Sequence, residues 1–552
     1  MRALPVTCAL VLRLSTADVH AAPQAAPPAV EAAPVVRSLE VRGATVYDLK
    51  AVQRILRVKP GGALRQPAPA LAALLENRYH ILGFPGARVE GRFDPATGTL
   101  SLTVDEGRLA AVDVEGLEGE TKARVLKVLD LRTGKAVQER DISGALARLE
   151  KTSGGAFAST AMPPYEVEPG PEGVKLVLHL RRRVAALQVR PGASTIPDLY
   201  NRVDGLNLGA NVRLTLFDPV SFDHAEVYAG ASYGFAAEKV RYAVGALKPF
   251  GPRRQAVVGY EHHDFTATDD AFRGRTVESP PGLTLYTSIF EDYYRRRGHE
   301  AYAFVRPTSR FQLGAAWRSD DYESLPVAGD DSFVFSRHRT PNPPVAAGRM
   351  RSILATARWS GKRDLFENWP GERTSLLQRN PYGTPFERGQ QARVEATWEV
   401  ASPGLGGDFS FRRFIGQARA AHVFSPRRIL LLRGLAGVGS GDVPPQRTLA
   451  LGGAGTLRGY ALKQFAGDRA VLGTAEYWLY PASPWPGLVF FYDGGTAWTR
   501  GRPRPGWKSD LGLGLDWPGG GPGYVRLDVG FPLDRGGSGR RARVYGQLRF
   551  PF

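Results

Sequence analysis

The feature that most constrains the fold is an alternation of apolar and polar residues that runs through residues 184–552. In the segment GYVRLDVGF, Val525 and Leu527 fall on one side of an extended strand, whereas Arg526 and Asp528 fall on the other. Segments of about ten residues with this pattern recur between short stretches of Gly, Pro, Asp and Asn, and no convincing helix interrupts them. A strand with one apolar and one charged face is typical of a transmembrane β-barrel, in which one face meets lipid.

The alternating segments predict a sixteen-stranded antiparallel barrel, an even number as in bacterial barrels. The connections at residues 320–347 and 362–390 are predicted to be extracellular loops. A soluble β-sandwich is the alternative, but its inner face would have to be apolar and free of arginine. The strands are predicted to start near Ala185, Asn207, His224, Lys239, Arg254, His299, Arg310, Arg349, Gln391, Phe411, Arg428, Asp468, Gly487, Trp507, Gly523 and Arg541.

The charge distribution argues against a nucleic-acid partner. The net charge is +18, which in a soluble protein would suggest one. Arginines alternate with apolar residues, as Arg541, Arg543 and Arg549 do, and this spacing is typical of a polar strand face. We therefore expect no nucleic-acid binding.

The N-terminal residues resemble an export signal. Residues 1–21 contain Arg2, an apolar stretch at 3–12 and a small-residue cleavage site, and they are predicted to be a signal peptide. Residues 22–35 are rich in Ala and Pro and are predicted to be a linker. The only cysteine, Cys8, lies in the predicted signal, so we expect neither a disulfide nor a thiolate metal site in the mature chain.

Between the linker and the alternating region, one order of elements occurs twice. Residues 36–106 are predicted to form a strand, two helices and two strands, and residues 107–183 repeat this order. The glycines Gly43 and Gly116 mark the repeat at a spacing of 116 − 43 = 73 residues. Each unit is predicted to pack two helices on a three-stranded sheet, and pattern alone also fits two α+β domains of unrelated role. One face of the second helix is expected to hold Leu71, Leu74, Leu75, Arg78, Tyr79 and Leu82.

Two stretches place a single charge in apolar surroundings. Residues 449–460 read LALGGAGTLRGY and contain Arg458, and residues 488–498 read LVFFYDGGTAW and contain Asp493. An unpaired charge in such surroundings would be costly. We therefore predict that Arg458 and Asp493 form a planar, bidentate ion pair that holds a loop against a strand.

These motifs, in their order and spacing, resemble the outer-membrane translocase superfamily of BamA-like and TamA-like proteins and two-partner-secretion transporters. Leu457-Arg458-Gly459-Tyr460 resembles the [VI]RG[FY] tip of that family's sixth extracellular loop, with Leu457 as a departure. The sequence FYDGG around Asp493 resembles its FxDxG strand, and GTAE at 473–476 resembles the Gly and Glu of the strand between. The two N-terminal repeats resemble polypeptide-transport-associated (POTRA) domains, including YHILGF and VDEGRLAAVDVEG.

The resemblance implies a fold, a site and a function. The implied fold is a 16-stranded antiparallel transmembrane β-barrel over 184–552 behind two N-terminal α+β POTRA domains at 36–106 and 107–183, with the barrel in the bacterial outer membrane and the repeats in the periplasm. The loop would fold into the lumen and form what we call the lumen lock, made of Arg458, Gly459, Tyr460, Glu476, Asp493 and Gly495. The alternative is that this contact only stabilises the barrel.

The implied function is the insertion, assembly or translocation of client proteins, without a cofactor, a metal or enzymatic chemistry. The POTRA repeats would capture unfolded outer-membrane or secreted clients, and a weak seam between the strands near Ala185 and Val544 would template them by β-augmentation. Outer-membrane lipid, lipopolysaccharide and accessory periplasmic proteins are the other expected partners.

The C-terminus resembles the sorting signal of outer-membrane barrels. Leu548, Phe550 and Phe552 lie on the apolar phase of the last segment. Gly546 is displaced by one residue from the commonest pattern, and Pro551 is unusual.

Three alternatives to an assembly role remain at this point. A two-partner-secretion transporter is favoured by the presence of only two repeats, but residues 22–35 are too proline-rich for the plug helix of that class. A passive pore would leave the repeats without a task. A surface hydrolase would rely on Ser232 in GASYG, which lies in an alternating segment with no following helix. His262 and His263 are expected to be solvated, and GGAG at 452–455 lacks the ending of a phosphate-binding loop.

Overall fold

The computed structural model describes residues 34–191, 200–218, 220–251, 255–270, 291–330, 339–361, 389–425, 427–481, 485–518, 524–534 and 542–549. The predicted signal peptide, most of the predicted linker and most of the predicted loop at 362–390 lie outside these residues. Within the described ranges, no helix is both long enough and apolar enough to span a membrane.

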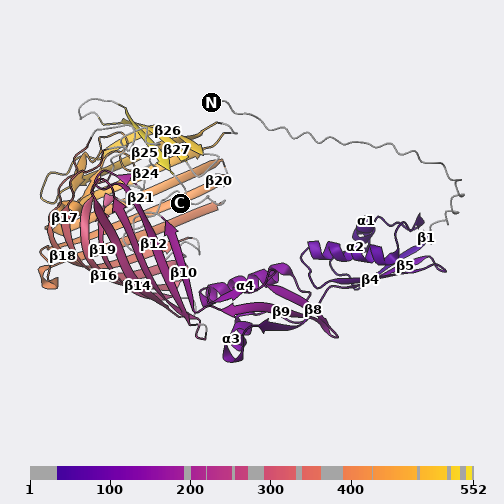
Figure 1. Cartoon of the computed structure of the whole chain (residues 1–552). Coiled ribbons are helices and arrows are strands. Elements are labelled where there is room, and N and C mark those ends of the chain that lie inside the picture. Colours follow the sequence, from indigo (N-terminus) through magenta and orange to yellow (C-terminus); the bar gives the residue numbers. More distant parts are fainter. Residues whose placement is uncertain are drawn as a thin grey trace, which may run out of the picture. The chain divides into compact units, whose positions relative to one another are not determined.

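The first α+β region forms a three-stranded sheet with two helices, as predicted (Figure 1). The sheet order is β2-β5-β4, with β2 parallel to β5 and β4 antiparallel to it. Helix α2 buries Leu71, Leu75 and Tyr79, which follow one another at four-residue intervals along one stripe. Leu74 and Leu82 were predicted on this face but are exposed, because their positions turn away from the stripe. The elements are β1 (Val35–Val36), β2 (Ser38–Arg42), α1 (Leu49–Leu56), β3 (Gly62–Ala63), α2 (Ala68–Ile81), β4 (Arg88–Asp94) and β5 (Thr99–Asp105).

The second α+β region repeats the first with one additional strand. Gly43 and Gly116 have φ angles of 81° and 82°, and a Cβ at these positions would lie 2.1 Å from the carbonyl oxygen of Val104 and 2.3 Å from that of Leu180, respectively. The same backbone turn therefore closes both units, which explains the glycine repeat. The sheet has four strands and not the three predicted, because β8 also pairs with β9. The elements are β6 (Leu109–Glu115), α3 (Gly119–Leu129), α4 (Glu139–Ser153), β7 (Phe157–Ser159), β8 (Tyr165–Gly170) and β9 (Gly173–Arg182).

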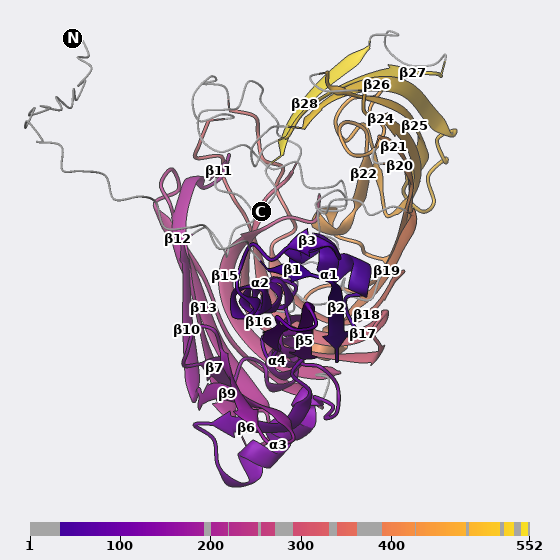
Figure 2. The same cartoon turned by 90° about the vertical axis from the view of Figure 1, so that its right-hand side faces the viewer.

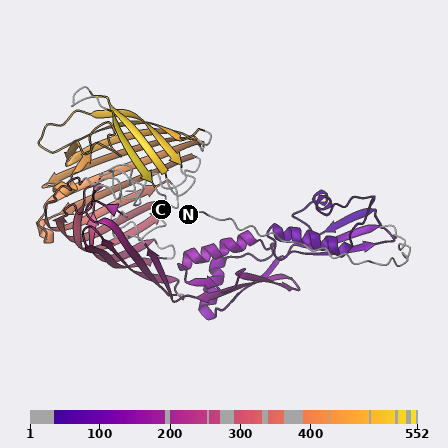
Figure 3. The same ribbon diagram turned by 45° about the horizontal axis from the view of Figure 1, so that its top comes forward.

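From residue 185 onward, most of the described residues form one curved antiparallel sheet of seventeen strand segments, β10 to β28 without β22 and β23 (Figure 3). Two of these segments, β10 and β11, pair with successive parts of β12, so the sheet has sixteen strand positions, which confirms the predicted number. The segments are β10 (Ala185–Pro191), β11 (Tyr200–Asn201), β12 (Gly205–Asp218), β13 (Asp223–Gly234), β14 (Lys239–Phe250), β15 (Ala256–Ala267), β16 (Tyr294–Thr308), β17 (Phe311–Ser324), β18 (Gly348–Ser360), β19 (Gly389–Ala401), β20 (Phe411–Ser425), β21 (Arg428–Gly441), β24 (Arg469–Leu479), β25 (Gly487–Trp498), β26 (Lys508–Pro518), β27 (Tyr524–Pro532) and β28 (Arg543–Arg549).

The two faces of this sheet have the polarity that a membrane barrel requires. Along β14, Arg241 is 3% exposed on the inner face, whereas Val240 is 57% exposed on the outer face. A soluble sandwich would show the opposite arrangement, with apolar residues inside. Other outward apolar residues are Leu187, Val258, Trp317, Ile353, Trp398, Phe414, Leu432, Phe490 and Leu513.

The structure corrects three local predictions. Strand β16 begins at Tyr294 and not near His299, and β17 continues to Ser324, so part of the predicted loop at 320–347 is strand. His263 is fully buried and not solvated, because β15 continues past it and its Nε2 lies 3.1 Å from Oδ1 of Asp320. Ser232, by contrast, is an internal residue of β13, as its place in an alternating segment predicts.

Candidate functional site: a loop tip in the lumen

The loop between β21 and β24 folds onto the concave side of the sheet, where Figure 2 shows β22. Its two arms, β22 (Leu449–Leu451) and β23 (Phe465–Gly467), pair with each other as a short hairpin. Leu449, Leu451 and Leu457 are buried in one cluster with inward residues of the wall, including Leu435 and Leu472. Burial of these leucines gives the loop an apolar attachment to the wall.

The glycines before the tip shape a tight turn. Gly452, Gly453 and Gly455 have φ angles of 114°, 85° and 74°, which side chains rarely adopt. The main-chain N–H of Gly453 donates to the carbonyl oxygen of Leu457 at 2.9 Å, and that of Gly452 donates to the hydroxyl of Thr456 at 2.9 Å. The GGAG sequence therefore serves the turn that presents Arg458.

The structure brings Arg458 into a bidentate contact with Asp493 on β25. Nε of Arg458 donates to Oδ2 of Asp493 at 2.7 Å, and Nη2 donates to Oδ1 at 2.8 Å. Nη1 donates to Oε1 of Glu476 on β24 at 2.6 Å, and it lies 3.3 Å from Oδ2 of Asp528 on β27. The guanidinium carbon lies 3.5 Å from the ring centre of Phe491, so its face is covered as well.

A second arginine, Arg526 on β27, completes the cluster. It donates to both oxygens of Glu476 at 3.0 and 3.1 Å and to Oδ1 of Asp528 at 2.8 Å. The indole N–H of Trp478 also donates to Glu476, at 2.9 Å. All five charged groups, the two arginines with Asp493, Glu476 and Asp528, are buried. Because desolvation offsets much of the attraction between buried charges, the network specifies geometry more than it adds stability.

Two glycines allow the loop backbone to touch the wall. A Cβ on Gly459 would lie 2.6 Å from Cβ of Asp510 and 2.8 Å from the backbone nitrogen of Pro532. A Cβ on Gly530 of β27 would lie 2.6 Å from the carbonyl carbon of Arg458. The tip is therefore held by backbone contact as well as by charge.

Tyr460 extends the contact toward the last strands. Its ring packs edge-on against Phe465 at 5.3 Å between centroids. Its hydroxyl donates to the carbonyl oxygen of Ser509 at 3.1 Å and lies 2.5 Å from Oδ2 of Asp534. Gly495 lies on β25 two residues after Asp493, and a Cβ there would lie 2.6 Å from the carbonyl oxygen of Val471.

Some participants were not identified from the sequence. The alternating pattern placed Arg526 and Asp528 on the inner face but gave them no role, because their partners belong to strands distant in the chain.

Of the residues of the predicted sorting signal, Leu548 lies in β28 in register with Val525, whereas Phe550 and Phe552 lie outside the described residues.

A barrel sheet of sixteen strand positions with a charged lumen, an inward loop and N-terminal α+β repeats defines an outer-membrane β-barrel protein. Residues 195–552 match the model of the Omp85 superfamily domain, and the chain belongs to the Omp85 superfamily.

The individual proteins that this chain is similar to share little sequence identity with it. The outer membrane protein assembly factor BamA of Nitratidesulfovibrio vulgaris is 24% identical over 274 residues, which are 46% of this chain and 31% of that protein. The chain thus spans about a third of the length of this relative. Among solved structures, BamA from Haemophilus ducreyi lacking POTRA domains 1-3 is similar with 13% identity and a TM-score of 0.48 over 94% of this chain and 100% of that one. CdiB from Acinetobacter baumannii is similar with 12% identity and a TM-score of 0.37 over 94% and 90%.

Proposed function

We propose that this protein assembles client proteins into the outer membrane or translocates them across it, and that it does so at the seam between its first and last strands. The observation that carries the proposal is the contrast between that seam and the rest of the wall. Among the described residues, β28 pairs only with β27, and β10 has no neighbour in the sheet other than β11 and β12. The lumen lock meanwhile ties the loop to β24, β25 and β27.

Unpaired strand edges can recognise client proteins through backbone hydrogen bonds. An edge strand carries free N–H and C=O groups that can pair with an incoming strand without regard to its side chains. β28 is attached through seven residue pairs, and β10 through seven as well. These short attachments support a seam that exchanges its own pairing for pairing with a client.

The periplasmic regions offer further edges. In the sheet of the first repeat, β2 and β4 lie at the two edges, and in the second repeat β6, β7 and β8 are the strands that flank β9. We propose that residues 36–106 and 107–183 act as two domains that hold unfolded clients by strand addition before they reach the seam. Lipid and lipopolysaccharide would contact the outward apolar residues, and accessory periplasmic proteins would contact the same N-terminal domains.

The test places a photo-activated crosslinking residue at Leu187 on the edge strand β10. Ile353 on β18 provides the matched control, because both side chains are outward and apolar, with exposures of 65% and 48%. We expect client proteins to crosslink at position 187 and not at position 353 in growing cells. Equal capture at both positions, or capture at neither, would contradict the proposal.

Depletion of the protein separates the two kinds of client. Loss of many barrels from the outer membrane supports assembly, whereas loss of one secreted product supports a two-partner-secretion transporter. An unchanged outer membrane with reduced solute uptake would instead identify a passive pore. Loss of a surface hydrolytic activity would point to Ser232.

A further inference from the structure

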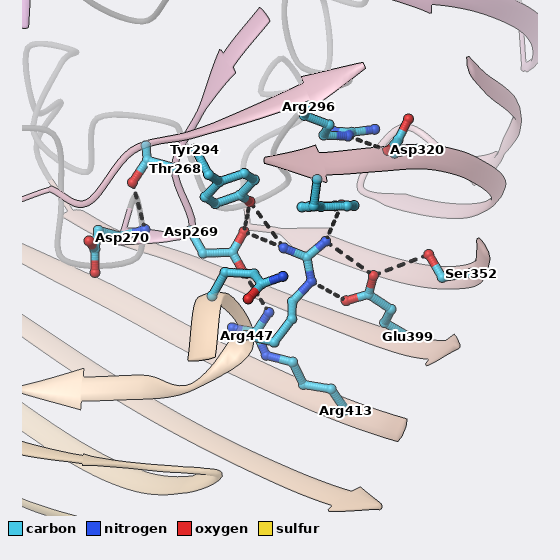
Figure 4. Close-up of polar contacts among 12 residues, drawn as sticks. Thr268, Asp269, Asp270, Tyr294, Arg296, Asp320, Ser352, Glu399, Arg413 and Arg447 are labelled. Atoms are coloured by element: carbon cyan, nitrogen blue, oxygen red, sulfur yellow. Dashed lines mark hydrogen bonds and ion pairs between the residues drawn. The ribbon is translucent and has the colours of Figure 1, made fainter. Parts of the chain in front are cut away.

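A second buried arginine lies at the base of the same loop. Arg447 ends a short helical turn, η3 (Pro445–Arg447), just before β22, and its side chain is 3% exposed (Figure 4). Its Nε donates to Oε2 of Glu399 at 3.1 Å, and its Nη1 donates to Oδ1 of Asp269 and to the hydroxyl of Tyr294, both at 3.0 Å. Its Nη2 donates to the hydroxyl of Tyr322 at 2.7 Å.

The partners of Arg447 belong to a different part of the wall from those of Arg458. Tyr294, Tyr322 and Glu399 lie on β16, β17 and β19, and Asp269 follows β15. The partners of Arg458 lie on β24, β25 and β27, and the two sets have no residue in common. The loop thus has polar attachments to two separate groups of strands.

The base cluster is balanced in charge. Arg413 on β20 donates to the second oxygen of Asp269 at 2.8 Å, and Ser352 on β18 donates to Glu399 at 3.2 Å (Figure 4). Two guanidinium groups, of Arg447 and Arg413, therefore face two carboxylates. A planar guanidinium can serve several acceptors at once, which a lysine ammonium at position 447 could not do with the same geometry.

Neighbouring contacts reinforce the base. The side-chain amide of Gln446 accepts from the main-chain N–H of Ala346 at 3.0 Å and donates to its carbonyl oxygen at 2.9 Å. Lys463, on the returning arm, lies 2.6 Å from Asp270 and 2.5 Å from Asp292. These contacts lie on the same side as the partners of Arg447, so the base is held at several points.

We propose that Arg447 is a second and independent anchor that positions the loop at residues 442–468. Arg447 fastens the base of the loop to β15–β20, and Arg458 fastens its tip to β24–β27. The loop is therefore a brace across the lumen, and it stays inside the barrel when the tip contact is released. This inference concerns the loop alone and holds whether the clients are assembled or secreted.

Hydrogen exchange on the purified full-length protein in detergent micelles tests the two anchors separately. Arg447→Ala should speed exchange about tenfold or more in peptides covering 442–451 and leave those covering 452–460 near the wild-type rate. Arg458→Ala should give the reverse, and the double variant should free both and raise single-channel conductance above that of either single variant. Arg412→Ala, which changes an exposed outward residue of β20, is the matched control.

Three results would overturn the inference. Arg447→Ala would do so if it freed the tip as fully as Arg458→Ala does, because the loop would then have one anchor. It would also do so if exchange at 442–451 matched the wild type, or if the double variant conducted no more than Arg458→Ala. Should Arg447→Ala fail to fold, Tyr322→Phe removes one acceptor hydroxyl and should speed exchange at 442–451 to a smaller extent, and no change there would count against the anchor.

Discussion

The hydroxyl of Tyr545 on β28 donates a hydrogen bond of 2.8 Å to the main-chain carbonyl oxygen of Tyr460 at the loop tip. This bond joins the last strand of the sheet to the loop that carries the lumen lock. Since β28 is paired on one side only among the described residues, the loop tip contributes to the position of the seam strand. Release of the tip should therefore loosen the seam.

Tyr545→Phe tests this connection with the loss of one oxygen atom. We expect amide exchange in β28 to rise about fivefold, as for the loss of one hydrogen bond worth roughly 1 kcal/mol, and client crosslinking at position 187 to increase. Tyr460→Phe is the matched control, because it removes the bonds to Ser509 and Asp534 but keeps the carbonyl that Tyr545 uses. Equal effects of the two variants on β28 would argue against a direct connection.

The contact between Arg458 and Asp493 predicts coupled mutational effects. Removal of one partner from a buried ion pair costs about 3–5 kcal/mol, because the other charge remains buried. Arg458→Ala leaves three carboxylates with Arg526 as the one remaining arginine of the cluster, whereas Asp493→Ala leaves Arg458 with Glu476 and Asp528. We therefore expect Arg458→Ala to be the more destabilising, and the double variant to be no worse than Arg458→Ala alone.

Urea-induced unfolding, followed by the shift in gel mobility of the barrel, measures these stabilities. Arg458→Lys should recover part of the loss, because it restores the charge but not the bidentate contact. Fully additive effects of the two alanine substitutions would contradict a coupled pair.

Backbone contact at the tip predicts that Gly459 tolerates no side chain. A methyl group there would meet Cβ of Asp510 and the backbone nitrogen of Pro532, and the wall cannot move aside without breaking its pairing. Gly459→Ala should displace the tip, speed exchange over 452–460 and cost about 1–3 kcal/mol. Gly473→Ala on β24 is the control, because the nearest atom there lies 3.9 Å away, and it should cost less than about 0.5 kcal/mol.

The sequence predicted the strands well where apolar residues alternate with charged ones, and less well at the ends of the strands. Strand starts at Ala185, Lys239, Phe411, Arg428 and Gly487 agree with the structure. The start of β16 was missed because it reads YRRRG, where both faces carry charge. Arg296 faces the lumen and pairs with Asp320, whereas Arg295 pairs with Asp264 and Glu323. At the end of a strand, both the inner and the outer face of the sheet can carry charged side chains, so the alternation of apolar and charged residues disappears.

The charged residues of the loop and of the wall around it could likewise be predicted only in part. Arg458, Asp493 and Glu476 could be found because each occurs in a recognisable motif. Arg447 and Arg526 could not, because nothing in the local sequence distinguishes them from other inward arginines. Their partners are fixed only by the curvature of the sheet, which brings β15 close to η3 and β27 close to β24.

Glu106 gives the first α+β region a dependence on pH. Its carboxylate accepts from the main-chain N–H groups of Thr45 at 2.6 Å and Val46 at 2.9 Å and from the hydroxyl of Tyr79 at 3.1 Å. Burial raises the pKa of Glu106, but these hydrogen bonds and one from the Thr45 hydroxyl outweigh it and hold the pKa below its ordinary value of 4.5. The motifs YHILGF and VDEG thus meet through Tyr79 and Glu106.

A lowered folded-state pKa means that Glu106 stabilises this region above about pH 4.5 and that the stabilisation is lost as the pH falls through the folded-state value. We expect the calorimetric unfolding temperature of the N-terminal region to fall as the pH drops from about 5 to about 3, because protonation of Glu106 removes its contribution to stability. Glu106→Gln should lower that temperature at pH 7 and flatten its dependence on pH, because the amide cannot ionise. Glu90→Gln, on β4 of the same sheet, should leave both quantities near the wild-type values. An unchanged pH profile in Glu106→Gln would show that another carboxylate is responsible.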